Sequence, residues 1–460
     1  MNCSQLITET DQIYPGMDRE DASVLVVGMG ATGLSVAHFL AAQAIRVMVV
    51  DSRKNPPELE ALQSLLSSSD LSAGDFSAEF FDRATHIVVS PGVSLDLPEL
   101  VAARAAGKVV LGDIDLFFCQ INEPVIAITG SNGKSTVTTL VGLMAEKSGR
   151  KVAVGGNLGR PALDLLREQN IDLYVLELSS FQLDSCELLD AKVATVLNVT
   201  EDHLDRYVGF GGYLDSKKRV FNGTGVMVLN RDDPQVMAMG LADRSIITFG
   251  LSKPEAGHYG IAEFEGESWF FKDEQFLLPV RKLKIKGHHN QANALAALAL
   301  GESVGLPMQP MLAVLSEFKG LDHRMQWVAE IDGVEWINDS KATNVGACQA
   351  ALDGLSGKVV LIAGGDGKGA DFSPLVEVVR GRVKAAILTG KDAKKMAQIL
   401  SPVTEVINVA DMHEAVLSAA ELAEVGDTVL LSPACASLDQ YSSYQARGNR
   451  FVEAVEGLVR

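Results

Sequence analysis

Short apolar runs alternate with helical patterns along the whole of this 460-residue chain, and no other feature of the sequence limits the possible folds as strongly. The runs with the length and composition of buried strands are residues 24–28, 47–51, 87–90, 125–129, 174–178, 193–198, 359–363, 385–389 and 429–432. Strands that alternate with helices form largely parallel sheets with helices on their faces. The sequence therefore predicts an α/β fold throughout.

The chain is longer than one hydrophobic core usually supports, which favours three domains. Gly112 and Asp113 separate the first α/β region from the second, and Gly320 precedes a hairpin-like segment at residues 327–338. We therefore expect domains at residues 1–112, 113–320 and 321–460. Residues 1–20 are polar and unpatterned, and they are predicted to form a loose arm.

Composition limits the cellular setting and the kinds of partner. No apolar run is long enough to cross a membrane, and the N-terminus lacks a basic flank and an apolar centre, so a cytoplasmic protein without membrane insertion is expected. The five cysteines show no C-x-x-C spacing, which indicates neither a disulfide framework nor a zinc site. A formal charge of −19 argues against binding to nucleic acid.

A strand, a glycine turn and the start of a helix follow one another at residues 126–136. Glycines let backbone N–H groups approach phosphate oxygens, a helix N-terminus adds partial positive charge, and a lysine with a hydroxyl suits phosphate and Mg²⁺. The alternative is a solvent-facing turn before an ordinary helix. We favour ATP binding by Gly130, Ser131, Asn132, Gly133, Lys134, Ser135 and Thr136.

The first domain opens with a second glycine motif. Gly28, Gly30 and Gly33 follow a strand and precede a helix, and Asp51 ends the next strand 18 residues beyond Gly33. This arrangement binds a pyrophosphate at a helix N-terminus, so it is compatible with a dinucleotide such as NAD or with another nucleotide. A purely structural turn is also compatible with it.

Eight motifs in order give a resemblance that covers essentially the whole chain after the arm. They are TGSNGKST at 129–136, GGNLG at 155–159, ELSSFQ at 177–182, DHLDRY at 202–207, GHHNQAN at 287–293, NDSKATN at 338–344, GGDGK at 364–368 and SPACASLDQ at 432–440. Together they resemble the Mur ligase family. The resemblance implies a Rossmann-like N-terminal domain, a central P-loop ATPase-like domain and a Rossmann-like C-terminal domain.

The family's reaction implies an ATP-driven amide bond rather than a redox step, with UDP in the first domain. UDP-substrate contacts are then expected from Gly30, Ala31, Thr32, Asp51, Ser52, Arg53, Ser90, Gly92 and Asn157. Each of these residues could instead belong to an ordinary turn.

Activation of a carboxylate by phosphoryl transfer needs charge neutralisation and alignment rather than a covalent nucleophile. Lys134 is expected to bridge the β- and γ-phosphates, while Ser135 and Glu177 hold Mg²⁺. In the family a histidine, here His203, faces a second Mg²⁺, and a lysine, here Lys217, is carried as a carbamate. Glu177 could be a solvated strand end, His203 a structural residue, and Lys217 a solvated helix lysine like Lys218.

The resemblance also assigns nucleotide contacts to Asn290, Arg324, Asp339 and Lys341. The segment 339–344 could be no more than a helix cap. D-glutamate is expected to bind through Lys368, Thr343, Ser437 and Tyr444, and the chain lacks the Asp-Asn-Pro-Arg type of motif found in relatives that add meso-diaminopimelate.

The expected activity is thus addition of D-glutamate to UDP-N-acetylmuramoyl-L-alanine by a monomer that uses ATP and two Mg²⁺ ions. Three alternatives stay open. The first is a ligase of the same superfamily that adds a different amino acid or acts on folate. The second is an NAD enzyme fused to an ATP-binding module, and the third is a nucleotide-binding regulator without catalytic activity.

Overall fold

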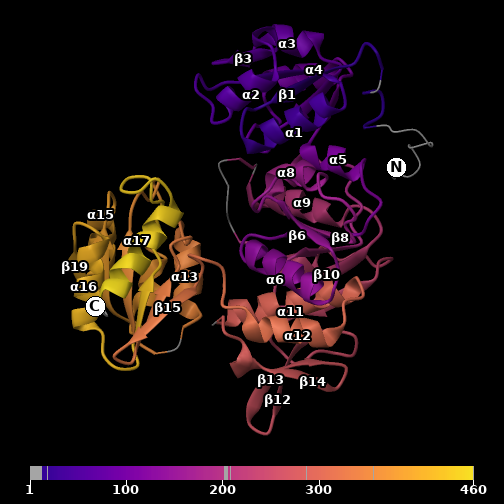
Figure 1. Cartoon of the computed structure of the whole chain (residues 1–460). Coiled ribbons are helices and arrows are strands. Elements are labelled where there is room, and N and C mark those ends of the chain that lie inside the picture. Colours follow the sequence, from indigo (N-terminus) through magenta and orange to yellow (C-terminus); the bar gives the residue numbers. More distant parts are fainter. Residues whose placement is uncertain are drawn as a thin grey trace. The chain divides into compact units, whose positions relative to one another are not determined.

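The computed structural model describes residues 13–17, 19–200, 206–207, 209–285, 287–355 and 357–458. These residues form two compact units. The first unit runs to Leu278 and resumes at Asn293–Val314, and the second contains Pro279–Ala292 and the chain from Leu315 onward. Figure 1 shows the elements of each unit.

A five-stranded parallel sheet begins the first unit. Its order is β3-β2-β1-β4-β5, so the chain changes direction across the sheet between β1 and β4. Ligands bind at such switch points, beyond the carboxyl ends of the strands. The elements are β1 (Ser23–Val27), α1 (Ala31–Ala42), β2 (Arg46–Asp51), α2 (Leu59–Leu65), β3 (Leu71–Ala73), α3 (Ala78–Arg83), β4 (His86–Val89), α4 (Pro98–Ala105) and β5 (Val109–Leu111).

The second sheet of this unit has six parallel strands in the order β11-β10-β9-β6-β8-β7. Its buried side chains join those of the first sheet in one continuous apolar cluster, which explains why the two sheets belong to one unit. The elements are α5 (Asp113–Phe118), β6 (Val125–Thr129), α6 (Lys134–Lys147), β7 (Val152–Gly156), α7 (Ala162–Leu165), β8 (Leu173–Glu177), α8 (Ser180–Asp184), β9 (Val193–Val196), α9 (Gly209–Lys218), β10 (Val226–Asn230), α10 (Pro234–Met237) and β11 (Ile246–Phe249).

A small three-stranded sheet follows, in the order β12-β13-β14. It consists of β12 (Gly260–Phe264), β13 (Glu267–Lys272) and β14 (Gln275–Pro279), and the helices α11 (His288–Ser303) and α12 (Met308–Glu317) come after it in the chain. Figure 1 shows the small sheet beside α11 and α12, with these helices between it and β6.

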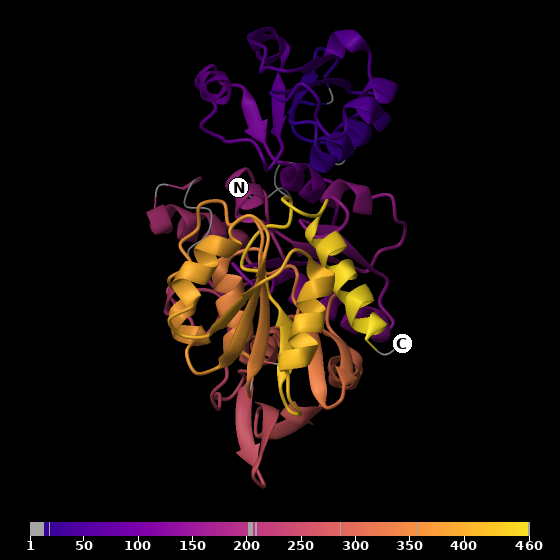
Figure 2. The same ribbon diagram turned by 90° about the vertical axis from the view of Figure 1, so that its left-hand side faces the viewer.

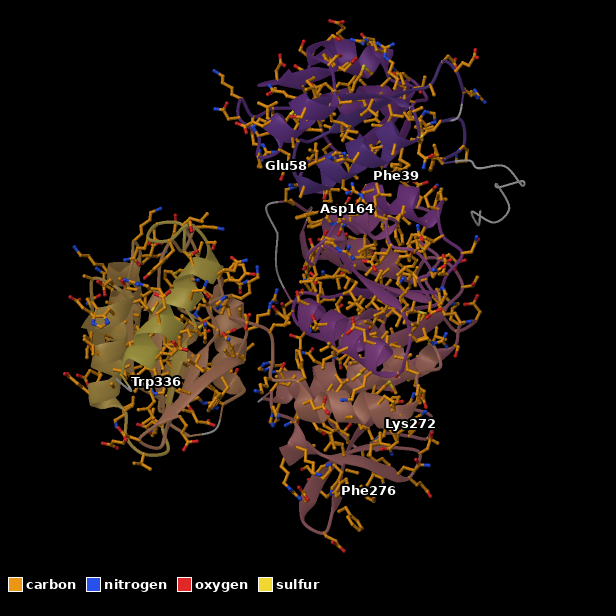
Figure 3. The ribbon with its side chains drawn as sticks, in the orientation of Figure 1. Phe39, Glu58, Asp164, Lys272, Phe276 and Trp336 are labelled. Carbon is orange, nitrogen blue, oxygen red and sulfur yellow. The ribbon has the colours of Figure 1, made fainter. Side chains whose placement is uncertain are left out.

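The second unit contains a six-stranded sheet in the order β15-β16-β20-β17-β18-β19, with only the β15–β16 pair antiparallel. Helices cover both of its faces (Figure 2). Trp336, labelled in Figure 3, is only 1% exposed and packs against Phe451. The elements are β15 (Gln326–Ile331), β16 (Val334–Asn338), α13 (Val345–Asp353), β17 (Val359–Gly364), α14 (Leu375–Val379), β18 (Val383–Thr389), α15 (Ala393–Leu400), β19 (Glu405–Asn408), α16 (Met412–Leu422), β20 (Thr428–Leu431) and α17 (Tyr444–Gly457).

The α/β prediction is confirmed, and each of the nine predicted runs overlaps a strand. The expectation of a loose arm does not hold for residues 13–17, because Ile13 and Met17 are buried and the carbonyl of Pro15 lies 3.2 Å from Nε2 of His86. Residues 1–12 and 18 lie outside the described residues. Within the described chain, no helix combines the length and the apolar character needed to cross a membrane.

Candidate active site

The loop between β6 and α6 has a backbone that only glycine adopts easily at two positions. Gly130 has φ +151° and Gly133, the N-cap of α6, has φ +85°. A Cβ on Gly133 would lie 2.4 Å from Oδ1 of Asn293, and one on Gly130 would lie 3.1 Å from Cβ of Leu197. Glycine is therefore needed for both conformation and space.

The segment that follows β9 fixes this loop in place. The backbone N–H of Asn132 donates to Oδ1 of Asn198 at 2.8 Å, and the Asn198 amide returns a bond to the carbonyl of Asn132 at 3.0 Å. The Ser131 hydroxyl lies 3.2 Å from that of Tyr213 on α9. Sequence reasoning missed Asn198 as a functional residue, although its position at the end of a predicted strand was a usable signal.

Two lysines converge on one carbonyl of the loop. Nζ of Lys134 donates to the carbonyl of Gly130 at 2.9 Å, and Nζ of Lys217 donates to the same oxygen at 2.9 Å. Lys217 is only 2% exposed, and its Nζ lies 4.5 Å from the ring centroid of Tyr213. Lys218, by contrast, is exposed. The geometry thus brings Lys217, and not Lys218, to the loop at residues 130–133, which we call the phosphate loop.

Glu177 ends β8, the strand next to β6, and is 3% exposed. Its Oε1 accepts a hydrogen bond from Nδ2 of Asn157 at 2.8 Å, whereas its Oε2 is buried and has no hydrogen-bond partner among the described residues. A buried carboxylate oxygen in this state suits a cation, and a hard divalent cation prefers oxygen ligands. The hydroxyl-bearing Ser135 is also buried, in the first turn of α6.

His203 lies outside the described residues. Among the residues that are described, no three His, Cys, Asp or Glu side chains are grouped so as to hold a metal ion.

A cavity of about 840 Å³ opens beyond the carboxyl ends of β1, β2 and β4. All nine residues predicted to contact the UDP-substrate line it: Gly30, Ala31, Thr32, Asp51, Ser52, Arg53, Ser90, Gly92 and Asn157. Asn157 also donates to Glu177, so this one side chain connects the cavity to the carboxylate beside the phosphate loop.

Asp51 organises the glycine turn of the first sheet. Its Oδ2 accepts a hydrogen bond from the backbone N–H of Met29 at 2.7 Å, and its Oδ1 accepts one from Nε of Arg53 at 2.9 Å. Burial raises the pKa of the Asp51 carboxyl, but the hydrogen bonds from Arg53 and Met29 outweigh burial and hold that pKa below its ordinary value. Asp51 is therefore an anion that fixes both the turn and the guanidinium of Arg53.

Two further cavity residues were missed by sequence reasoning. Nη1 of Arg206 donates to the carbonyl of Gly92 at 3.2 Å, and its guanidinium lies 4.7 Å from the ring centroid of Phe181. Gln182 lines the cavity too and donates to Oδ2 of Asp113 at 3.4 Å. Both belong to motifs quoted for the family resemblance, which was the available signal.

In the second unit, functional candidates gather where parallel strands end. Asp339, directly after β16, accepts a hydrogen bond from the backbone N–H of Met325 at 3.1 Å and one from the Ser432 hydroxyl at 3.0 Å. Burial raises the pKa of the Asp339 carboxyl to about 7, although those two bonds and nearby Arg324 lower it. A nearby cation would stabilise the ionised form of this buried carboxyl group.

Lys341 and Tyr444 meet at this edge. Nζ of Lys341 lies 4.3 Å from the ring centroid of Tyr444, the first residue of α17. The Ser340 hydroxyl donates to the carbonyl of Tyr444 at 2.8 Å, which ties the two segments together. Thr343 follows in the same loop, just before α13.

The turns that carry Lys368 and Ser437 are also joined. An isolated antiparallel bridge pairs Asp366 with Ala436, and Lys368 adopts φ +50° just after it. Arg447, only 2% exposed, donates from Nη2 to the carbonyl of Ser340 at 2.7 Å and from Nη1 to that of Cys435 at 3.1 Å. Sequence reasoning missed Arg447, because an arginine within a helix is usually exposed.

The four D-glutamate candidates thus lie on connected segments of the second unit, with Lys368, Thr343 and Ser437 in loops and Tyr444 at the start of α17. The candidate nucleotide contacts Asn290, Arg324, Asp339 and Lys341 belong to this unit as well, whereas the phosphate loop belongs to the first.

Three family models match the chain. They describe a Mur ligase MurD-like N-terminal domain over residues 22–112, a Mur ligase middle domain over residues 128–301 and a Mur ligase glutamate ligase domain over residues 323–435.

Curated relatives match nearly the full length. The UDP-N-acetylmuramoylalanine–D-glutamate ligase of Methylococcus capsulatus is 54% identical over 436 residues, covering 95% of each chain. The protein of the same name from Pseudomonas aeruginosa is 51% identical over 439 residues, covering 95% of this chain and 98% of its own.

Solved structures share the fold at lower identity. A UDP-N-acetylmuramate-alanine ligase from Thermotoga maritima has a TM-score of 0.59 at 21% identity and covers 95% of this chain and 99% of its own. A pseudomurein peptide ligase type C from Methanothermus fervidus has a TM-score of 0.57 at 21% identity and covers 95% and 100%, respectively.

Proposed function

The chain belongs to the Mur ligase family, and from this premise we propose that it joins D-glutamate to UDP-N-acetylmuramoyl-L-alanine in peptidoglycan precursor synthesis. The reaction consumes ATP and releases ADP and phosphate. The names of relatives that are about half identical over nearly the whole chain support this substrate and this amino acid.

One contact carries the proposal on the structural side. Asn157 lines the large cavity and donates to Glu177 at 2.8 Å, and Glu177 lies in register with Ile128 of the strand that leads into the phosphate loop. A UDP-linked substrate in the cavity can therefore extend its carboxylate past Asn157 toward the γ-phosphate of ATP. A cavity without the Asn157–Glu177 contact would support nucleotide binding but not phosphoryl transfer from ATP to the substrate.

We assign ATP to the loop formed by Gly130, Ser131, Asn132, Gly133, Lys134, Ser135 and Thr136. Nζ of Lys134 donates to the carbonyls of Gly130 and Ser131, and phosphate oxygens of bound ATP would replace these acceptors. The N-terminus of α6 adds partial positive charge at the same place.

Mg²⁺ fits the residues around Glu177. The buried and unpartnered Oε2 of Glu177 is an oxygen donor suited to a hard cation, and the hydroxyl of Ser135 in the first turn of α6 is a second. We propose two ions, with His203 and a carbamate of Lys217 as ligands of the second. Bound Mg²⁺ would neutralise charge on the transferred phosphoryl group.

We divide the work among domains at residues 1–112, 113–320 and 321–460. The first holds the UDP-substrate and the second holds ATP. The third holds D-glutamate through Lys368, Thr343, Ser437 and Tyr444, and Arg324, Asp339 and Lys341 complete the nucleotide site with Asn290 of the second domain. A dianionic amino acid needs such donors, and Lys368 and Ser437 lie on turns joined by the Asp366–Ala436 bridge.

The chemistry needs two substitutions. A carboxylate oxygen of the substrate attacks the γ-phosphorus, ADP leaves, and an acyl phosphate forms. The amine of D-glutamate, once deprotonated, then attacks the acyl carbon, and phosphate leaves with the former carboxylate oxygen. The protein acts by alignment and charge neutralisation, since neither step needs a protein nucleophile.

We further propose that the protein acts in the cytoplasm as a monomer.

Phosphate release from MgATP with UDP-N-acetylmuramoyl-L-alanine tests the function. D-glutamate, L-glutamate, meso-diaminopimelate and L-lysine are supplied in parallel, and release is expected with D-glutamate alone. Release with a different amino acid would keep the ligase chemistry and overturn the assignment of the third domain. Release with none of them would exclude the proposed reaction.

A further inference from the structure

The small sheet β12–β14 takes no part in the proposed active site, and one of its faces is aromatic. Ala262 pairs with Trp269 and Phe264 pairs with Glu267, so these alternate positions share a face. Phe276 of β14, labelled in Figure 3, lies on the same sheet.

Four rings on this sheet contact one another. The ring centroid of Phe276 lies 4.7 Å from that of Phe264, 6.1 Å from that of Trp269 and 5.1 Å from that of Phe271. Phe264 is 43% exposed and Phe276 is 37% exposed. We call Phe264, Trp269, Phe271 and Phe276 the aromatic face, to which Phe271, only 6% exposed, contributes little accessible surface. Exposed aromatic clusters of this kind mark interaction sites more often than single exposed apolar residues do.

Carboxylates dominate the same strands and turns. Between Tyr259 and Pro279 the sequence has five acidic residues and a single basic one, Lys272. Nζ of Lys272 donates to Glu302 at 2.5 Å and lies 5.1 Å from the ring centroid of Tyr259, so this cation is already engaged. The acidic residues are Glu263, Glu265, Glu267, Asp273 and Glu274.

The aromatic face already accepts a cation from its own chain. Nζ of Lys253 lies 5.5 Å from the ring centroid of Phe271, within the range of a cation–π contact. The indole Nε1 of Trp269 is buried and has no hydrogen-bond partner among the described residues.

We propose that the aromatic face and its carboxylates form a docking site for a basic polypeptide segment of a partner protein. Arginine or lysine side chains of the partner stack on the exposed rings of Phe264 and Phe276, and their charges are attracted by the carboxylate of Glu267 on the same face and by those of Glu265, Asp273 and Glu274 in the adjoining turns. Nucleic acid and anionic membranes are poor occupants, because both carry the same sign of charge as the rim. A second copy of this chain would bring like carboxylates together.

The test uses the full chain and a short fluorescein-labelled peptide of alternating arginine and leucine. Saturable binding is expected, measured by fluorescence anisotropy. The double variant Phe264→Ser/Phe276→Ser keeps the net charge and should weaken binding about tenfold, since stacking contacts are lost. The variant Glu265→Gln/Glu274→Gln, which neutralises one exposed carboxylate in each turn of the sheet, should also weaken binding and should reduce its dependence on salt.

The control Val425→Ser changes an apolar residue of the second unit that is 84% exposed, and it should bind like the wild type. All variants should keep wild-type phosphate release, which also shows that they fold. Lack of saturable binding would overturn the proposal. Equal affinity of the wild type and the Phe264→Ser/Phe276→Ser variant would do the same, since it would show only diffuse attraction to an acidic protein.

Discussion

Two buried carboxylates of the first unit each have an oxygen without a hydrogen-bond partner among the described residues, and they differ in what surrounds them. Oε2 of Glu177 lies beside the phosphate loop, whereas Oδ1 of Asp113 lies at the start of α5, outside the proposed chemistry. An unpartnered carboxylate oxygen in the interior is costly unless a cation or a proton joins it. We infer a metal ion at Glu177 and, below about pH 6, a proton at Asp113.

Glu177→Gln keeps the shape of the side chain and removes its charge. We expect phosphate release to fall at least about 100-fold, because the variant loses a group that holds charge in the transition state. The melting temperature should not fall, since a buried charge is removed. Wild-type activity of the variant with an unchanged dependence on Mg²⁺ concentration would show that Glu177 is not a metal ligand. Glu168→Gln, which removes a carboxylate that pairs with Arg160 outside the site, serves as control.

The variant Asp113→Asn tests whether the Asp113 carboxyl is protonated in the folded protein. Burial raises the pKa of the Asp113 carboxyl from 3.8 to about 6. The folded state therefore binds this proton more tightly than the unfolded state, so the free energy of unfolding should fall as pH rises from about 4 to about 6. A shift of this size corresponds to about 3 kcal/mol.

The Asn variant does not titrate at this position. Its melting temperature should decline less across this pH window than that of the wild type, as scanning calorimetry at several pH values would show. The surface control Asp82→Asn should follow the wild type. Parallel curves for Asp113→Asn and wild type would contradict the assignment.

At the scale of elements, sequence patterns predicted the buried parallel strands well and the exposed strands poorly. Strands such as β1, β6 and β17 are buried along their whole length, and their continuous apolar runs reveal them. β3 has three residues, none of them buried, so it leaves little hydrophobic signal. The small sheet β12–β14 was missed because charged residues interrupt its pattern.

The residues of the candidate site also differ in how well the sequence predicts them. Residues on glycine turns at strand ends, such as Gly133 and Asp51, were predictable because the turn chemistry is local. Asn293 and Arg447 reach their places only through tertiary packing, across long separations in sequence. Local patterns carry no information about such contacts.

Gly133→Ala tests the phosphate loop as an element. Both φ +85° and a contact of 2.4 Å with Asn293 oppose a side chain here, so we expect loss of ATP binding and a lower melting temperature. Gly149→Ala is a matched control, because Gly149 has φ +80° and no atom within 4 Å of the added Cβ. The control should cost only about 1–2 kcal/mol from the backbone and should keep activity. Equal effects of both substitutions would show that Asn293 does not shape the loop.

At the scale of the whole molecule, the proposed reaction joins groups held by different units. ATP is assigned to the first unit and D-glutamate to the second, yet the amine must reach the acyl carbon. We therefore expect ligands to bring the units into a more closed arrangement, with the segment around Gly320 as a hinge. The radius of gyration from small-angle scattering should decrease with substrate, D-glutamate and a non-hydrolysable ATP analogue. Identical profiles with and without ligands would argue against closure.

The division of the chain between units also bears on how the protein is made. The first segment of the first unit ends at Leu278, yet the unit also includes Asn293–Val314, which the ribosome adds only after Pro279–Ala292 of the second unit. Asn293 lies against Gly133, so a nascent chain that has exposed the phosphate loop still lacks one of its walls. The phosphate loop can therefore gain this wall only after residue 293 has left the exit tunnel, and a fragment cut after Leu278 would not contain a complete first unit.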